Sequence, residues 1–197
     1  IEELPRTSKT ELGDEREMPF IHDLFDLAIK KFAPDIIFFS NIDINFCSNI
    51  VGQVSDAMQY KKAICSKRID FDRVNDEIPP EKMGEGKEVL YGYDLFVMER
   101  FWWEEYKYLL PPVLLGCERW DMLLGDIINI FFPFAEIKNL TYHEKHFQFW
   151  AQPQNKFANK GNRYNIEVSK DCYSKFRILR LLSGMMRGEL DRDFAIG

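Results

Sequence analysis

The chain has 197 residues, of which 46% are hydrophobic, and that is enough for one domain with a buried core. Its formal net charge of −6 argues against a nucleic-acid partner, because nucleic-acid binders usually present a basic face. No apolar run reaches the ~20 residues that a membrane span requires, so we expect no membrane span in this chain.

Helical and strand patterns alternate along the chain. In chain order, we predict a loop (1–19), a helix (20–32), a strand (35–40), a helix (49–60), a strand (62–65), a mobile loop (73–88), a strand (94–98), a helix (119–132), a strand (137–142) and a C-terminal helix (171–187). The first strand is nearly all apolar, which is typical of a strand buried on both faces. This alternation favours a single α/β domain, residues 1–197, with a mostly parallel sheet flanked by helices.

The cysteines are widely spaced and form no Cys-x-x-Cys pair: Cys47, Cys65, Cys117 and Cys172. This spacing predicts buried free thiols in a reducing compartment rather than a zinc site or a disulfide framework. We therefore expect the protein in the cytoplasm or on the cytosolic face of a membrane.

Polar side chains gather at or just after three of the predicted strand ends. They are Asp43, the pair Arg68 and Asp70, and the pair His143 and His146. In open α/β sheets, ligands bind at the carboxyl ends of the strands. The sequence therefore predicts one binding site built from these segments.

Two of these clusters contain candidate metal ligands. Asp43 follows a buried strand, where a carboxylate can hold Mg²⁺ or Mn²⁺ against substrate phosphates. His143 or His146 can provide an imidazole, which suits Mn²⁺ better than Ca²⁺. The alternatives are that Asp43 caps the following turn and that the histidines are surface or hydrogen-bonding residues.

Other residues are candidates for catalysis and substrate binding. Asp121 lies in the first turn of a predicted helix, where it can act as a general base, with Glu118 as the alternative base. Taken alone, this motif is better explained by ordinary helix capping, which is common. Arg68 can pair with a phosphate, hold Asp70 in place, or form a simple surface ion pair with it. The aromatic residues around Trp102 and Trp103 can stack on sugars or pack in the core.

The order of these short motifs resembles a bacterial and plant group of glycosyltransferase-A-like nucleotide-diphospho-sugar transferases. The matching segments are Asn41-Ile42-Asp43-Ile44, Ser66-Lys67-Arg68-Ile69-Asp70, Gly92-Tyr93-Asp94-Leu95-Phe96-Val97, Pro111-Pro112 through Trp120-Asp121, and His143 with His146. The resemblance spans roughly residues 10–165, and the collinearity of the motifs carries it.

The resemblance implies a role for each matching residue. Asp43 with His143 or His146 would bind Mn²⁺ or Mg²⁺, and Asp121 would be the catalytic carboxylate placed at a helix start. Arg68 and Asp94 would line the sugar or phosphate pocket; we assign Asn41, Asp70 and Trp120 to the same pocket. The nucleotide-binding strand that opens such folds has no candidate before residue 20, so we expect this part to be missing.

The expected function is transfer of a sugar from a nucleotide-diphosphate donor to a hydroxyl of a glycan or another acceptor. The first alternative is a glycan- or nucleotide-binding module that keeps the fold without the chemistry. The second is a structural or interaction domain in which these polar residues cap turns.

Overall fold

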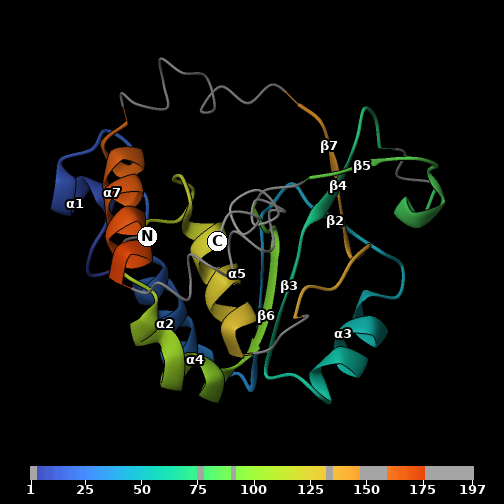
Figure 1. Ribbon diagram of the computed structural model, residues 1–197, viewed down its shortest axis with the longest axis horizontal. Coiled ribbons are helices and arrows are strands. Elements are labelled where there is room, and N and C mark those ends of the chain that lie inside the picture. The colour runs from blue at the N-terminus through green and yellow to red at the C-terminus, as the bar shows by residue number, and fades with distance from the viewer. Residues whose placement is uncertain (1–3, 75–77, 90–91, 132–134, 147–158, 176–197) are drawn as a thin grey trace, which may run out of the picture.

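The computed structural model describes residues 4–74, 78–89, 92–131, 135–146 and 159–175, which form a mixed α/β fold (Figure 1). The described α-helices are α1 (Ser8–Leu12), α2 (Ile21–Phe32), α3 (Ile50–Met58), α4 (Arg100–Tyr106), α5 (Trp120–Phe131) and α7 (Lys160–Lys175). Two short 3-10 helices, η1 (Pro80–Lys82) and η2 (Lys107–Leu109), lie in connections. The predicted α/β class is confirmed.

The described strands form two sheets. One has the order β1 (Ile36–Ser40), β6 (Leu95–Glu99) and β3 (Ala63–Ser66). The other has the order β2 (Asn45–Phe46), β7 (Thr141–Glu144), β4 (Arg68–Phe71) and β5 (Lys87–Glu88). Only Lys67 separates β3 from β4, so one stretch of chain joins the two sheets.

The prediction of a mostly parallel sheet is wrong for the described strands. β6 runs antiparallel to both β1 and β3, and β2–β7 and β4–β5 are antiparallel as well. Among the named strands, β4 and β7 form the parallel pair. A parallel neighbour requires a crossover, usually a helix. The described chain between β4 and β6 contains only η1 and β5 and no crossover helix. The chain therefore enters β6 in the direction opposite to that of its neighbour β3.

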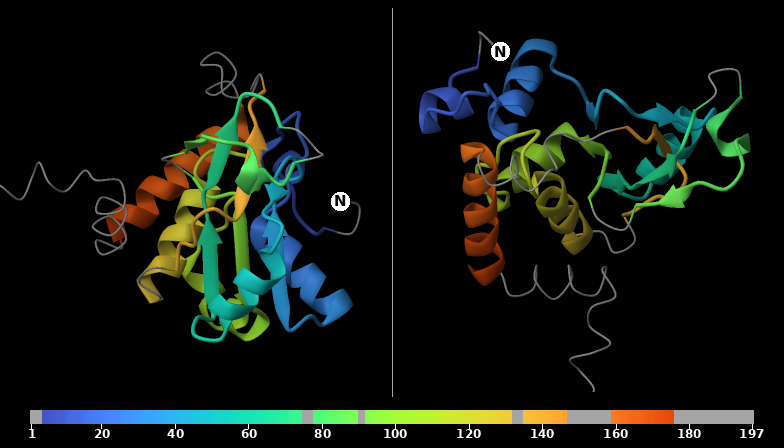
Figure 2. Two further views of the ribbon diagram at one scale, coloured as in Figure 1. Left: turned by 90° about the vertical axis from the view of Figure 1, so that its right-hand side faces the viewer. Right: turned by 90° about the horizontal axis from the view of Figure 1, so that it is seen from above.

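Each face of the three-stranded sheet carries its own apolar cluster. Phe96 and Met98 of β6 face the larger cluster, which includes buried residues of α2, α4 and α5. Leu95 and Val97 face a smaller cluster with α3 and the second sheet. Figures 1 and 2 show the same division, with α2, α5 and α7 on one side of β6 and the second sheet on the other. Because successive side chains of β6 point to opposite faces of the sheet, this one strand contributes to both apolar clusters and joins them.

β1 differs from its prediction. It is an edge strand, and Ile36 and Phe38 are 48% and 46% exposed, so the strand is not buried on both faces. Only the face with Ile37 and Phe39 belongs to the larger cluster. An apolar run indicates a strand, but it does not reveal whether the strand has one neighbour or two.

Several boundaries also moved. The predicted N-terminal loop contains α1, which begins with a capping box between Thr7 and Thr10. The strand predicted over 137–142 is Thr141–Glu144, and the predicted connection 73–88 contains η1 and β5. The C-terminal helix begins earlier than predicted, at Lys160, and residues 176–187 of that prediction lie outside the described residues.

A candidate metal and reaction centre

The strand pairing brings several of the predicted site residues together. β4 and β7 are parallel neighbours, and their register places Asp70 opposite His143. Asn41 follows β1, and its backbone N–H donates to the carbonyl of Asp94, which precedes β6, at 3.3 Å. Because both sheets contribute to this place, residues distant in sequence form one polar network around the junction of β3 and β4.

Asp43, His143 and His146 form a group that can hold a metal ion. One ligand atom from each lies within 4.8 Å of the other two. The Asp43 Oδ2 atom is 3.2 Å from His146 Nε2 and 3.4 Å from His143 Nε2. The His143 side chain is 2% exposed, whereas Asp43 and His146 are 45% and 52% exposed. The group is therefore anchored in the interior and open to solvent on one side.

The buried ring of His143 has one nitrogen without a partner. Its Nε2 atom makes no hydrogen bond with any described residue. A buried nitrogen of this kind costs free energy unless something satisfies it. Since it points at the shared oxygen of Asp43, a cation between them would supply the missing interaction. The residues present therefore fit a divalent metal.

A second layer of charged residues supports His143. Asp70 Oδ1 lies 3.0 Å from His143 Nδ1 and accepts a hydrogen bond from Arg68 Nε at 2.8 Å. Arg68 also donates to Asp94 Oδ1 at 3.1 Å, and the Asn41 amide donates to the same oxygen at 2.6 Å. Of the predicted roles of Arg68, holding Asp70 in place is the one that these contacts favour, because its donors are directed at two carboxylates.

The charges in this network shift the pKa of two carboxyl groups in opposite directions. Partial burial alone would raise the pKa of Asp43, but the hydrogen bond with His146 and the charges of both histidines lower it overall. Burial raises the pKa of Asp94, against the opposing effects of Arg68 and Asn41, and the charge of Asp43 raises it further. Asp43 is thus favoured as an anion, as a metal ligand must be.

Asp121 lies in the first turn of α5 and faces the same network. Its Oδ2 atom accepts a hydrogen bond from the backbone N–H of Tyr93 at 3.1 Å. Burial raises its pKa to about 6; the backbone N–H groups of Met122 and Tyr93 oppose the shift, and the charge of Asp94 adds to it. Asp94 therefore interacts electrostatically with Asp43 on one side and with Asp121 on the other.

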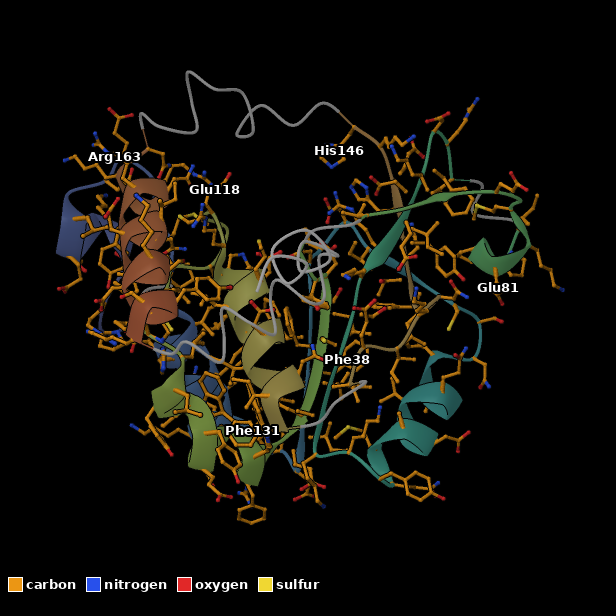
Figure 3. All side chains as sticks on the ribbon, viewed as in Figure 1. Phe38, Glu81, Glu118, Phe131, His146 and Arg163 are labelled. Carbon is orange, nitrogen blue, oxygen red and sulfur yellow. The ribbon has the colours of Figure 1, made fainter. Side chains whose placement is uncertain are left out.

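Two further predicted residues lie apart from this network. Trp120 is only 5% exposed and packs between Phe39 and Phe96, so it is a core residue and offers no open face to a substrate. Glu118 lies in the loop before α5, where its backbone N–H donates to Asn162 at 3.1 Å. Figure 3 shows Glu118 and His146 on opposite sides of the upper end of the molecule.

A pocket of about 620 Å³ lies on the other face of β4 and β7. Ile69, Phe71 and Tyr142 line it, and these alternate along the strands with Asp70 and His143. The remaining lining residues come from α3 and the segment before it, from η1 and the segment between η1 and β5, and from the segment before β7: Cys47, Ser48, Asn49, Gln53, Pro80, Glu81, Gly84, Glu85, Gly86, Lys138 and Asn139. None of the predicted site residues lines it, so we place the candidate site at the polar network.

Sequence reasoning missed two contacts of the site. The pairing of Asp70 with His143 depends on β7 lying beside β4, which no local pattern reveals. The approach of Gly92 to Asp121 was also missed: Gly92 has φ +84°, and a Cβ there would collide with the Asp121 carboxylate. The signal available in the sequence was the position of Gly92, two residues before the candidate Asp94.

The four cysteines are buried and free, as predicted, and burial raises the pKa of Cys117 to about 12 and of Cys172 to about 11. Among the described residues, no helix is both long and apolar enough to cross a membrane. Comparisons with protein-family models, with curated proteins and with solved structures found no match to this chain.

Proposed function

We propose that the chain is a metal-dependent glycosyltransferase, which transfers a sugar from a nucleotide-diphosphate donor to a hydroxyl of a glycan or another acceptor. The observation that carries the proposal is the convergence of Asp43, His143 and His146 with Asp121 through Asp94. These residues come from four separate motifs of the sequence resemblance.

The donor atoms of the site favour one class of metal. Two imidazoles and one carboxylate suit a transition ion such as Mn²⁺ better than Mg²⁺, which prefers oxygen ligands and retained water. When bound, the ion supplies positive charge that neutralises the diphosphate leaving group. Asp43 and His146, which are about half exposed, would hold it where a substrate can reach it.

The negative charge of the network supports the need for such an ion. Asp43, Asp70, Asp94 and Asp121 are accompanied by one guanidinium, that of Arg68. A diphosphate approaching this surface without a cation would meet net repulsion. Since Arg68 already donates to two carboxylates, we propose the metal rather than Arg68 as the partner of the diphosphate.

Asp121 is the proposed general base. A pKa of about 6 leaves it mostly ionised at neutral pH while keeping it basic enough to accept a proton. The Tyr93 N–H donates a hydrogen bond to Oδ2 and fixes the carboxylate in place. Direct attack by that hydroxyl on the sugar would invert the anomeric centre. General-base assistance of this kind is worth about 10²–10⁴-fold in rate.

The experiment measures donor turnover by the full chain. UDP-, GDP- and CDP-sugars are titrated with and without Mn²⁺, and binding and hydrolysis of each donor are followed. The proposal expects Mn²⁺-dependent binding and slow hydrolysis that Asp121→Asn abolishes. Binding without turnover by any donor would favour the alternative of a non-catalytic module. If Asp43→Ala and Asp121→Asn change only stability, these residues are structural.

A further inference from the structure

The ring of His143 lies between two carboxylates that contact different nitrogens. Nδ1 is 3.0 Å from Asp70 Oδ1, and Nε2 is 3.4 Å from Asp43 Oδ2. The side chain is 2% exposed, so solvent does not satisfy either nitrogen. The position of the ring proton therefore decides what Nε2 presents toward Asp43. It is a lone pair if the proton is on Nδ1 and an N–H if the proton is on Nε2.

Asp70 is held as a hydrogen-bond acceptor. Arg68 Nε donates to the same oxygen that faces His143, at 2.8 Å. Arg68 is fixed in turn by Asp94, to which it donates at 3.1 Å. Since the carboxylate is already paired with a guanidinium, the Asp70–His143 hydrogen bond is made with His143 Nδ1–H as donor. A neutral His143 protonated on Nδ1 leaves the lone pair on Nε2.

We infer that Asp70 is a positioning residue, which fixes the Nδ1–H tautomer of His143 and thereby presents Nε2 as a ligand to a transition-metal ion. The inference rests on the metal site of the proposed function. It replaces the predicted role of Asp70 in the substrate pocket with a role behind the metal ligand. Metal-bound histidines commonly donate their second ring N–H to such a carboxylate.

The parallel register of β4 and β7 holds Asp70 and His143 beside each other. Asp70 and His143 are directly opposite each other on paired strands, so the hydrogen bond needs no loop to hold it. Asp72 provides a matched control, because it follows the same strand and is 92% exposed. It pairs with Lys145 at 2.6 Å and makes no contact with His143 among the described side-chain interactions.

The first test reads the tautomer in metal-free protein. The chain has three histidines, so the ring ¹⁵N signals can be assigned from His22→Gln and His146→Gln variants. We expect the Nδ1–H form of His143 in the wild type and in Asp72→Asn. Asp70→Ala, and to a smaller degree Asp70→Asn, should shift the signals toward the Nε2–H form. An Nε2–H tautomer in the wild type, or no change in Asp70→Ala, overturns the inference.

The second test measures affinity for Mn²⁺ and Co²⁺ by calorimetry. Loss of a carboxylate behind a metal-bound histidine typically weakens binding about 10–100-fold, and we expect that loss in Asp70→Ala. Asp70→Asn keeps an oxygen acceptor, so its affinity should lie between those of the wild type and Asp70→Ala. Asp72→Asn should bind both ions with wild-type affinity. Circular dichroism confirms that each variant is folded. If Asp70→Ala does not fold, Asp70→Asn alone decides, and wild-type affinity in it overturns the inference.

The two tests separate this inference from the proposed function. If the wild type binds neither ion, the metal-dependent transferase fails, although the tautomer of His143 can still be as expected. If the wild type binds Mn²⁺ and every Asp70 variant binds it equally well, the metal site stands and the positioning role of Asp70 is wrong.

Discussion

The carboxylate of Asp121 accepts a hydrogen bond from the backbone N–H of Tyr93 at 3.1 Å. The neighbouring Gly92 leaves room for this carboxylate because it has no side chain. The Gly-x-Asp segment before β6 and the Trp-Asp segment before α5 are therefore two sides of one contact. Asp121 is held against the segment that carries Asp94, and this contact gives it a defined position relative to the metal group.

Gly92→Ala should disturb Asp121 directly. Gly92 has φ +84°, and a Cβ there would meet the Asp121 carboxylate. The left-handed backbone alone costs a non-glycine residue about 1–2 kcal/mol. Gly84 is a matched control, because its φ is +96° and nothing lies within 4 Å of its added Cβ. We expect urea unfolding to show a larger loss of stability for Gly92→Ala than for Gly84→Ala, and turnover to fall only in Gly92→Ala. Equal losses in both variants would mean that the Asp121 contact is unimportant.

The raised pKa of Asp121 predicts a dependence of stability on pH. The pKa rises from 3.8 to about 6 on folding, so the folded state binds the proton more tightly than the unfolded chain. The contribution of Asp121 to the free energy of unfolding therefore falls as pH rises from about 4 to about 6 and stays low above that.

Asp121→Asn removes this penalty. At pH 7.5 the variant should be more stable than the wild type. At about 1.4 kcal/mol for each pKa unit the upper bound is about 3 kcal/mol. We expect a smaller difference, because solvent screens part of the interaction. At pH 4 the two should differ little. Urea unfolding at both pH values measures the difference, and a variant less stable than the wild type at pH 7.5 contradicts the burial of an ionised Asp121.

The sequence was sufficient to locate much of the fold and the site. The apolar periods predicted α2, α3, α5, β1, β3 and β6 to within a few residues, because these elements bury a regular face. Polar residues at strand ends identified Asp43, Asp70 and His143, and the motif resemblance added Asp94. The structure joins these four residues in one network. The direction of β6 was not predictable, because local apolar spacing is the same in parallel and antiparallel strands.

Trp120 illustrates the limit of a motif. Its place beside Asp121 indicated a substrate contact, but the first turn of α5 points the two side chains in different directions. Asp121 faces Tyr93, whereas Trp120 packs with Phe39 and Phe96 in the core. Adjacent helical residues do not share a face, so a conspicuous aromatic residue beside a site aspartate need not belong to the site.

The burial of Trp120 predicts a stability effect. Trp120→Ala should lower the free energy of unfolding by about 3–5 kcal/mol, because it leaves a cavity between two aromatic rings. Phe101, which is 64% exposed on α4, is the control, and Phe101→Ala should change stability by about 0.5 kcal/mol or less. Denaturant titration at one pH compares them. A Trp120→Ala variant that keeps wild-type stability and loses only donor binding would restore Trp120 to the substrate pocket.

A metal bound by Asp43, His143 and His146 should stabilise the folded state. A ligand at 100 times its Kd adds about 2.7 kcal/mol when it binds only the folded protein. The donor set predicts that Mn²⁺ raises the Tm more than Mg²⁺ at equal concentration. His143→Ala should remove the Mn²⁺ shift, since Nε2 of His143 is the buried ligand atom. His22→Gln changes a different, partly buried histidine, whose Nε2 lies 2.9 Å from the Lys107 carbonyl. That variant should have a lower Tm but the full Mn²⁺ shift, and an equal loss of the shift in both variants would show that the ion binds elsewhere.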